Sequence, residues 1–526
     1  MWNVYHFPPT HGGFRVNTKI RKQIERRQRQ IARRLDKSDN RGCDRPMMTA
    51  TNIHYEIADR TQATAAGGIG AIHLLVRKLG LDEAINRCLG VLKIHLPYHD
   101  SDHVLNIAYN LLAGGKCLEH LEFRRQDAAY LDALGARRIP DPTTAGDFCR
   151  RFDAPRIYCL QQIFNATRQK VWQQQPASFF AEAILDADGT MVETSGEHKE
   201  GMEINYQGQW GYHPLVLSLA NTGEPLFVVN RPGNRPSHEQ AAWYFDRAIE
   251  LCRQGGFRKI LLRGDTDFTQ TAQLDRWDQD GVKFVFGIDA TEKLNGLAAE
   301  LPLEAWKTLV RRVNKPLKTR PRARRPNVKQ QIVEARQFED IRTVREHVAE
   351  FTYRPQMCAK AYRVVVVWKD LEVYRGQQML FDKARCFFYI TNVAKKPAQQ
   401  IVFTANDRCG QENLLGVQKD DVRSLTAPLD NLHSNGAYMV MATLAWSLKA
   451  WSALLLPETG RWEEKHREEK RKLLRMEFST FRQALVNVPA QILRTGRKIV
   501  NRLLAWNPWQ NVFFRLLEQL DRPLKC

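Results

Sequence analysis

The order of strand-type and helix-type segments between residues 181 and 290 limits the possible folds more than any other feature of the sequence. Three short apolar runs come first, AEAILDAD, GYHPLVLSLA and LFVVN, and the turn-type segment NTGEP separates the last two. An amphipathic helical segment at 238–253, the run FRKILLRGD, a second helical segment and the run VKFVFGID follow. Three adjacent strands and then alternating helices and strands predict an α/β domain with a mixed sheet.

The remainder of the chain is arranged around this α/β unit. Apolar residues recur at helical spacing from about residue 54 to 175, and within this stretch DPTTAGDFCRRF predicts a helix that begins at Pro142 with a threonine cap. β-rich runs such as AYRVVVVWKDLEVYR predict an insertion, after which CFFYITN resumes the α/β pattern. The expected parts are a basic flexible tail at 1–50, a helical domain at 51–178, the first part of the core at 179–290, the insertion at 291–385, the second part of the core at 386–456 and a basic helical region at 457–526.

No segment predicts export or a membrane span. Residues 437–456 approach the length of a span, but Lys449 and three serine or threonine side chains interrupt them, which favours a buried core helix. The N-terminus lacks a signal pattern, and the ten scattered cysteines contain no CxxC pair with zinc-ligand spacing. These features indicate a cytoplasmic protein with reduced cysteines.

The net charge of +21 is concentrated in three blocks. Residues 1–50 carry a net +8, residues 305–333 carry ten basic and no acidic side chains, and residues 461–526 carry a net +8, so the other 381 residues sum to −5. Such blocks suit a protein that holds a polyanion from several sides, because each neutralised phosphate releases a counterion. The alternative is three solvated surfaces or flexible tails, an alternative that is weakest for 305–333 because no carboxylates are mixed with its cations.

Three acidic residues stand where reacting groups collect in an α/β sheet. Asp188 ends the first predicted strand, Asp265 ends a later one, and Glu412 lies on a helix in NDRCGQENLLGVQK. Side chains at these strand ends project into the crevice beyond the sheet, and three carboxylates there would hold two hard divalent cations. Two such ions about 4 Å apart activate a water or a 3′-hydroxyl for phosphoryl displacement.

Each acid taken alone is more simply read as an ordinary loop or cap residue. The residues around Glu412 favour a functional site instead, because Arg408 lies one helical turn before it and Lys419 falls close to the same stripe. Two cations beside a metal-binding acid suit a bound phosphate.

In this arrangement the sequence resembles bacterial insertion-sequence transposases of the DDE type, which have a ribonuclease H-like core. It looks like the branch with a β-strand insertion between the second Asp and the Glu, and with a Y-x2-R-x3-E-x6-K signature. The resemblance spans about residues 50–455 and rests on DPTTAGDFCRRF, Asp188 to Thr190, GYHPLVLSLANTG, RPGN at 231–234, RGDTDF, CFFYITN and Arg408, Glu412 and Lys419.

The resemblance implies that Asp188, Asp265 and Glu412 are catalytic and bind two Mg²⁺ ions, with Mn²⁺ as a substitute. It implies DNA as the partner, both the terminal inverted repeats of the element and the target, and a homodimer in the synaptic complex. The helical domain at 51–178 would bind DNA, in a bacterial cytoplasm beside the nucleoid. The expected DNA-binding side chains are Arg408, Lys419, Arg311, Arg312, Arg324, Arg325 and Trp306.

One residue departs from the family signature, and two acidic positions have neighbours that compete with them. Ala405 stands where the signature has its tyrosine, which leaves open how the DNA ends are processed and whether a hairpin forms. Asp188 is preferred to Asp186 because it directly precedes Gly-Thr, and Asp265 is preferred to Asp267 because it stands at the strand end.

Four side chains have two interpretations each. Trp306 either stacks on a displaced base or, more simply, packs the insertion. His213 is expected to be a core or turn residue, although it neighbours the first carboxylate, and Asn392 is a weaker candidate for a DNA contact. Arg263 either binds phosphate or pairs with an acid. Two other functions remain open: a DNA-binding protein that has lost activity, and a metal-dependent nuclease that cuts without joining.

Overall fold

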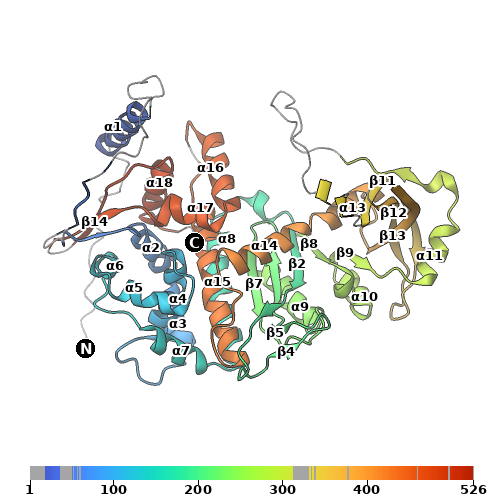
Figure 1. The fold of residues 1–526 in the computed structure, drawn as a ribbon, viewed down its shortest axis with the longest axis horizontal. Coiled ribbons are helices and arrows are strands. Elements are labelled where there is room, and N and C mark those ends of the chain that lie inside the picture. Colours follow the sequence, from blue (N-terminus) through green and yellow to red (C-terminus); the bar gives the residue numbers. More distant parts are fainter. Residues whose placement is uncertain are drawn as a thin grey trace.

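The computed structural model describes residues 18–35, 50, 52–55, 57, 61–311, 331–332, 335–336, 339–375, 378–458, 460–495 and 498–524. Figure 1 shows helices from both ends of the chain at one end of the molecule, a sheet in the middle, and a group of long strands at the other end.

The central strands form a ribonuclease H-like sheet. Its order is β7-β6-β2-β8-β9, in which β2 is antiparallel to β6 and parallel to β8, and β9 is parallel to β8. The sequence predicted each of these strands as an apolar run and the mixed sheet from their order. The elements are β2 (Ala183–Gly189), β6 (Leu215–Leu219), β7 (Glu224–Val229), α9 (Ala241–Gln254), β8 (Ile260–Gly264), α10 (Thr271–Gln279) and β9 (Lys283–Ile288).

Between β2 and β6 the chain forms a second, small sheet. Its order is β3-β5-β4, with all pairs antiparallel. The strands are β3 (Val192–Glu193), β4 (Glu203–Ile204) and β5 (Trp210–Tyr212).

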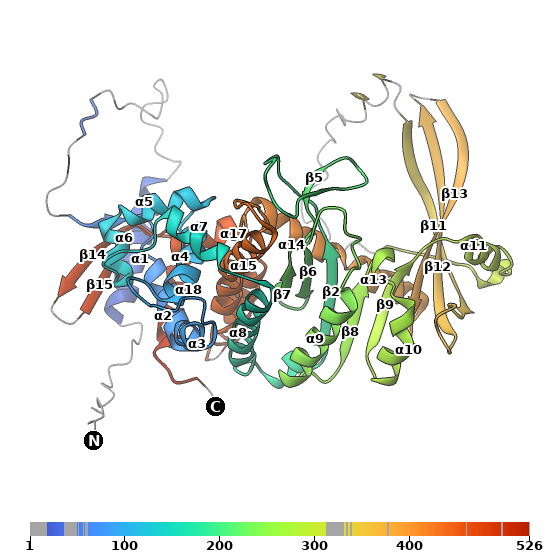
Figure 2. The same ribbon diagram turned by 90° about the horizontal axis from the view of Figure 1, so that it is seen from below.

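The insertion extends the central sheet instead of forming a separate one. Strand β13 pairs with β9, and β12, β11 and β10 follow outward, so that nine strands are hydrogen-bonded in one sheet. The expected boundary at 385/386 therefore lies within β13. In Figure 2 the long strands β11, β12 and β13 lie at the opposite end of the molecule from the N-terminal helices. The elements are α11 (Glu292–Ala299), β10 (Lys307–Thr308), β11 (Glu339–Tyr353), β12 (Tyr362–Arg375) and β13 (Gln378–Thr391).

The N-terminal part is helical, as its apolar spacing predicts. In α7 the predicted helix start is found at Pro142, but the cap is Asp141 and not a threonine, because the Asp141 carboxylate accepts from the Thr144 backbone N–H at 2.9 Å. The elements are α1 (Thr18–Arg34), β1 (Ala63–Thr64), α2 (Ile69–Leu79), α3 (Leu81–Cys88), α4 (Asp100–Leu112), α5 (Leu121–Arg125), α6 (Ala128–Leu134), α7 (Pro142–Arg150) and α8 (Ala154–Trp172).

Helix α15 (Leu432–Leu454) is the central helix of the molecule and is buried along almost its whole length. This confirms the expected core helix at 437–456. Among the described helices, none has both the length and the apolar character that a membrane crossing requires. The neighbouring elements are α13 (Ala398–Asn406), α14 (Cys409–Asp420), α16 (Glu463–Arg475) and α17 (Phe478–Phe481).

The C-terminal region completes the N-terminal helical domain. It contains helices but also a hairpin, β14 (Ala490–Thr495) with β15 (Lys498–Leu503), which the sequence analysis did not predict and which pairs with β1. Gly68 lies so close to this region that a Cβ there would meet the Leu485 carbonyl oxygen at 1.8 Å. Helix α18 (Gln510–Leu520) packs near α2, and α1 contacts β15 through a 2.8 Å bond from Arg27 to the Leu503 carbonyl.

A buried ion pair joins α8, β7 and α15. The Glu224 carboxylate, which is fully buried, accepts hydrogen bonds from Arg168 at 3.0 Å, Thr222 at 2.6 Å, Trp172 at 3.2 Å and Trp451 at 2.9 Å. Arg168 is 2% exposed. A buried pair is tolerable only when its remaining hydrogen-bonding groups are satisfied, and this carboxylate meets that condition.

Candidate active site

The central sheet brings two of the predicted acids to one edge. Asp186 of β2 pairs in register with Arg263 of β8, and two residues further along these parallel strands come Asp188 and Asp265. Parallel neighbours end at the same edge, so both carboxylates lie at that edge, with Asp188 next to last in β2 and Asp265 directly after β8. Glu412 lies in the first turn of α14, which packs against β2.

Helix α14 is fixed on the sheet by the residue before Glu412. The buried Gln411 amide donates to the Val216 carbonyl oxygen at 3.0 Å, and the Ser218 hydroxyl donates to the Gln411 carbonyl oxygen, both on β6. Gln411 thereby sets the position of Glu412 over the sheet. No pattern in the sequence indicates this role of Gln411, because its spacing does not show which strand it would contact.

One guanidinium contacts all three predicted acids. Arg408 Nη1 lies 3.2 Å from Asp188 Oδ2 and 3.6 Å from Asp265 Oδ2, and Arg408 Nη2 lies 3.2 Å from Glu412 Oε1. The acids differ in exposure, from 13% for the Asp188 side chain and 34% for Asp265 to 57% for Glu412. The site therefore has two partly buried carboxylates and one that reaches into solvent.

The electrostatics of the site favour an added cation. Burial, and then the negative charge of Asp265, raises the pKa of Asp188 to about 7, while Arg408 opposes the shift. Burial also raises the pKa of Asp265. Three carboxylates share one guanidinium, so the ionised site has a negative excess that a positive ligand would stabilise.

The competing acids are accounted for by other contacts. Asp186 is buried and accepts two hydrogen bonds from Arg263, at 2.7 and 2.6 Å, so Arg263 is the partner of an acid and not a free phosphate ligand. Asp267 is exposed, and its backbone N–H donates to the Asp265 side chain at 3.1 Å. The geometry thus favours Asp188 and Asp265 over their neighbours.

The other predicted DNA-binding residues that the structure describes, Lys419, Arg311 and Trp306, are not gathered around the three acids. Lys419 is half-buried on α14, and no ion pair among the described residues joins it to the three acids. Arg311 pairs with Glu346 of β11, at 2.5 and 2.9 Å. Trp306 packs edge-on against Trp368 with ring centroids 5.7 Å apart, which agrees with the simpler interpretation of this residue. Arg312, Arg324 and Arg325 lie outside the described residues.

Two of the weaker candidates have structural roles. The His213 ring packs so closely on Gly189 that a Cβ added to Gly189 would lie 2.7 Å from it. Arg231 Nη2 lies 3.4 Å from His213 Nδ1. Burial and the Arg231 charge lower the pKa of His213 to about 4, so it is neutral at pH 7. Asn392 bonds to the Phe284 N–H at 3.0 Å and to Asp278 at 2.8 Å, which uses its amide within the protein.

A cavity of about 420 Å³ adjoins Asp265 and Arg408. Ala405, the residue at the tyrosine position of the signature, lines it, and so does Tyr389 of β13. The Tyr389 hydroxyl lies 3.5 Å from the Asn406 side-chain oxygen. A phenol is therefore present in this cavity, although it comes from a different element.

The comparisons with known proteins decide the family. A family model described as "Transposase DDE domain group 1" matches residues 51–525. The chain belongs to this DDE transposase family. A structure of the piggyBac transposase synaptic complex with hairpin DNA is similar at 9% sequence identity and a TM-score of 0.33, over 81% of this chain and 84% of that chain. A comparison with curated proteins gives no match.

The donor set of this DDE transposase fits a hard divalent cation, because carboxylate oxygens are the ligands that such ions prefer. As the side chains stand, no group of three or more His, Cys, Asp or Glu residues in the described part of the chain is arranged to hold an ion. The Arg408 guanidinium lies between the three carboxylates instead. Metal binding at this site therefore requires Arg408 to move.

Proposed function

We propose that this protein cuts and joins DNA at the ends of a bacterial insertion sequence, with Asp188, Asp265 and Glu412 as its metal-binding catalytic residues. The observation that carries the proposal is the convergence of these carboxylates, from two neighbouring strand ends and one helix, on a single cationic group. Family membership supports it, because the chain matches a DDE transposase domain over most of its length.

The chemistry is divided between the metal ions and the side chains around them. When bound, two Mg²⁺ ions, or Mn²⁺ in their place, would activate water or a 3′-hydroxyl and stabilise the leaving oxygen. The three carboxylates would hold these ions, with the Asp188 side chain 13% exposed and Glu412 reaching into solvent. Arg408, displaced from the carboxylates, positions the phosphate, and Lys419 lies further along the same helix.

The DNA partners are those that the family resemblance implies, and the basic blocks support contacts with a phosphate backbone. The helical domain would bind the terminal inverted repeats, the basic block at 305–333 would follow the backbone of the DNA, and the C-terminal region would contact DNA or a second subunit. Two copies would pair the ends in a synaptic complex, in the bacterial cytoplasm at the nucleoid. Target DNA would then accept the cut strands.

Cleavage of a supercoiled plasmid that carries the terminal repeats of the parent element tests this proposal. With Mg²⁺ we expect cuts at the element boundary, and we expect Asp188→Asn and Glu412→Gln to abolish them. Asp267→Asn is the matched control. It removes an exposed carboxylate beside the site, and among the described residues this carboxylate forms no ion pair with Arg408. Undiminished cutting by Asp188→Asn would show that the metal site lies elsewhere.

The same assay with labelled ends separates the alternatives. Joined products identify a transposase, and cutting without joining identifies a nuclease. Binding to the repeats without cutting, in several divalent metals, would identify a DNA-binding protein that has lost its activity.

A further inference from the structure

The helical domain contains a cavity that the proposed catalytic site does not use. It has a volume of about 560 Å³ and lies between α7, the segment 91–98, α4 and the start of α8. Four residues of the DPTTAGDFCRRF motif line it, Thr144, Asp147, Phe148 and Arg151, at the i, i+3, i+4 and i+7 spacing of one helical face. This motif is thereby assigned to one wall of a cavity of ligand-binding size.

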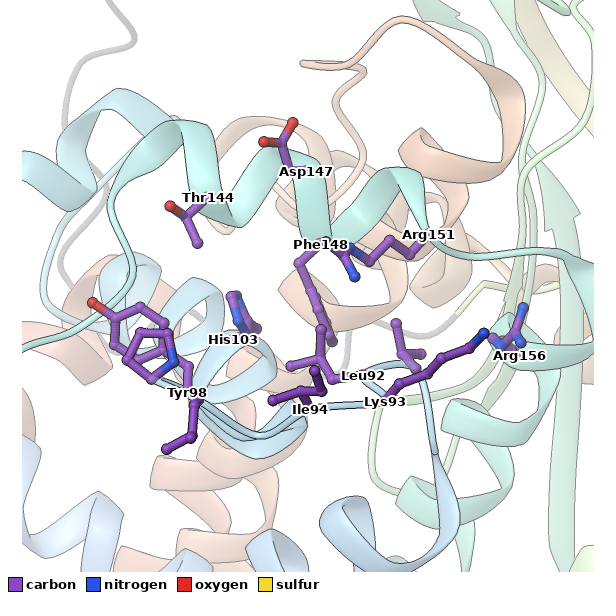
Figure 3. Close-up of a pocket in the computed structure, with 13 residues that line it drawn as sticks. Leu92, Lys93, Ile94, Tyr98, His103, Thr144, Asp147, Phe148, Arg151 and Arg156 are labelled. Carbon is purple, nitrogen blue, oxygen red and sulfur yellow. The ribbon is translucent and has the colours of Figure 1, made fainter.

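The wall of the cavity is aromatic on one side. His103 stacks on Phe148 with ring centroids 4.3 Å apart and an angle of 8° between the planes, and Tyr98 meets His103 edge-on at 5.6 Å. Figure 3 shows Tyr98 and His103 together at one end of the cavity. On the segment that closes it, Ile94 and Leu96 are 72% and 83% exposed. A flat ligand with apolar faces would cover these groups.

His103 has an unused hydrogen-bonding atom in this wall. It is 3% exposed, and its Nδ1 is buried with no hydrogen-bond partner among the described residues. Burial, and then the charge of Arg151, lowers the pKa of His103 to about 4, so the ring is neutral at pH 7. A buried polar atom without a partner costs about 1–3 kcal/mol, and a ligand with a polar edge would remove that cost.

The other end of the cavity is cationic. Figure 3 shows Lys93, Arg151 and Arg156 on the side of α8. Arg156 pairs with Asp153 at 2.8 Å, whereas Lys93 and Arg151 have no ion pair within the described part of the chain. Asp147, the acid of the cavity, pairs with Arg150 at 2.9 Å. Two free cations are therefore available for an anion.

We propose that this cavity binds one unpaired nucleotide of DNA, with the base at the His103 end and the phosphate on Lys93 and Arg151. This inference rests on the proposed function, because only a DNA substrate would supply the unpaired nucleotide. A hollow of this size accepts a base that has left the stack and not the edge of a paired one. The site is separate from the three carboxylates and recognises the structure of a DNA end, independently of cutting.

Binding of labelled duplexes without divalent metal tests the inference. One duplex carries a single unpaired adenosine, and its partner carries an abasic residue at the same position. Fluorescence anisotropy in EDTA should show that the wild type binds the unpaired adenosine about fivefold more tightly or better, because base–aromatic stacking is worth about 1–3 kcal/mol. His103→Phe keeps the aromatic stack but removes the ring nitrogen, and it should reduce this preference without lowering the thermal stability of the free protein.

Arg151→Ala tests the phosphate end with an exposed residue whose loss does not threaten the fold. It should weaken binding of both duplexes about tenfold and reduce the slope of log Kd against log salt by about 1. Arg125→Ala is the matched control, because it removes the same charge from α5 outside the cavity. It should leave the affinity for both duplexes and the salt slope unchanged.

Three results would overturn the inference. They are equal wild-type affinity for the two duplexes, an unchanged preference in His103→Phe together with an unchanged affinity in Arg151→Ala, and competition by free dAMP without any preference between duplexes, which would assign the cavity to a soluble nucleotide. Plasmid cutting by the same wild-type preparation in Mg²⁺ separates this failure from that of the proposed function. A protein that cuts but ignores the unpaired base refutes the nucleotide site alone.

Discussion

Replacement of Glu224 by glutamine removes the negative half of the buried pair between β7 and α8. Arg168 would then be buried without a counter-ion, and breaking such a pair costs about 3–5 kcal/mol. The new amide group would also face donors that now reach a carboxylate oxygen, Trp172 and Trp451 among them. We therefore expect Glu224→Gln to lower the free energy of unfolding by about 4 kcal/mol, a large fraction of the about 5–15 kcal/mol of a typical protein.

Urea unfolding followed by tryptophan fluorescence measures this loss, and two of the reporting indoles bond to the altered carboxylate. The matched control is Glu122→Gln, which breaks an exposed pair with Arg125 and should cost less than about 1 kcal/mol. In the double variant of Arg168→Met and Glu224→Gln the losses should fall short of their sum by about 2 kcal/mol. A cost below about 1 kcal/mol for Glu224→Gln would refute the reasoning, because the pair would then contribute no more than an exposed one.

Three further predictions concern the core, the candidate site and the contact between the two ends of the chain. Burial lowers the pKa of Lys449 from 10.5 to about 7, so between these pH values the unfolded chain binds one proton more than the folded chain, and the free energy of unfolding rises with pH. The rise is up to about 1.4 kcal/mol per pH unit. Lys449→Met should remove it in denaturant titrations from pH 6 to 9. Arg408→Gln should tighten Ca²⁺ binding about tenfold in calorimetric titrations, because the guanidinium no longer competes for the carboxylates, and weaker binding would contradict its position between them. Gly68→Ala should lower the free energy of unfolding by about 3 kcal/mol or more in thermal unfolding experiments, because its Cβ would collide with the Leu485 carbonyl. The control Gly296→Ala has open space around the new Cβ and should be neutral or stabilising in the same experiment.

Elements whose signal is local could be predicted from the sequence. The strands β2, β6, β7, β8 and β9 are short apolar runs between turn residues, and the structure finds each in place. Helix α15 could be predicted from its length and hydrophobicity. The hairpin β14–β15 was missed because its apolar residues stand in adjacent pairs, Ile492–Leu493 and Ile499–Val500, between polar residues. Its strands therefore lack the apolar–polar alternation of a half-buried strand.

The candidate site could be predicted only in part. Strand ends and the helix after them indicated Asp188, Asp265 and Glu412, which the structure brings together around Arg408; their catalytic role stays a prediction. The contact between Gln411 and β6, like the pairing of Asp186 with Arg263, depends on which residues meet across long sequence distances. Such pairs leave no periodic pattern in the chain.

The pairing of β1 with β14 has a consequence for synthesis of the protein. About 425 residues separate the two strands along the chain, so at about 5–20 residues per second the first waits roughly 20–85 s for its partner. Until then Gly68 and the face of α2 that the last residues cover have nothing to pack against. The helical domain is thus the first part of the chain to be made and among the last to be finished, and a chain that stops before residue 490 cannot complete it.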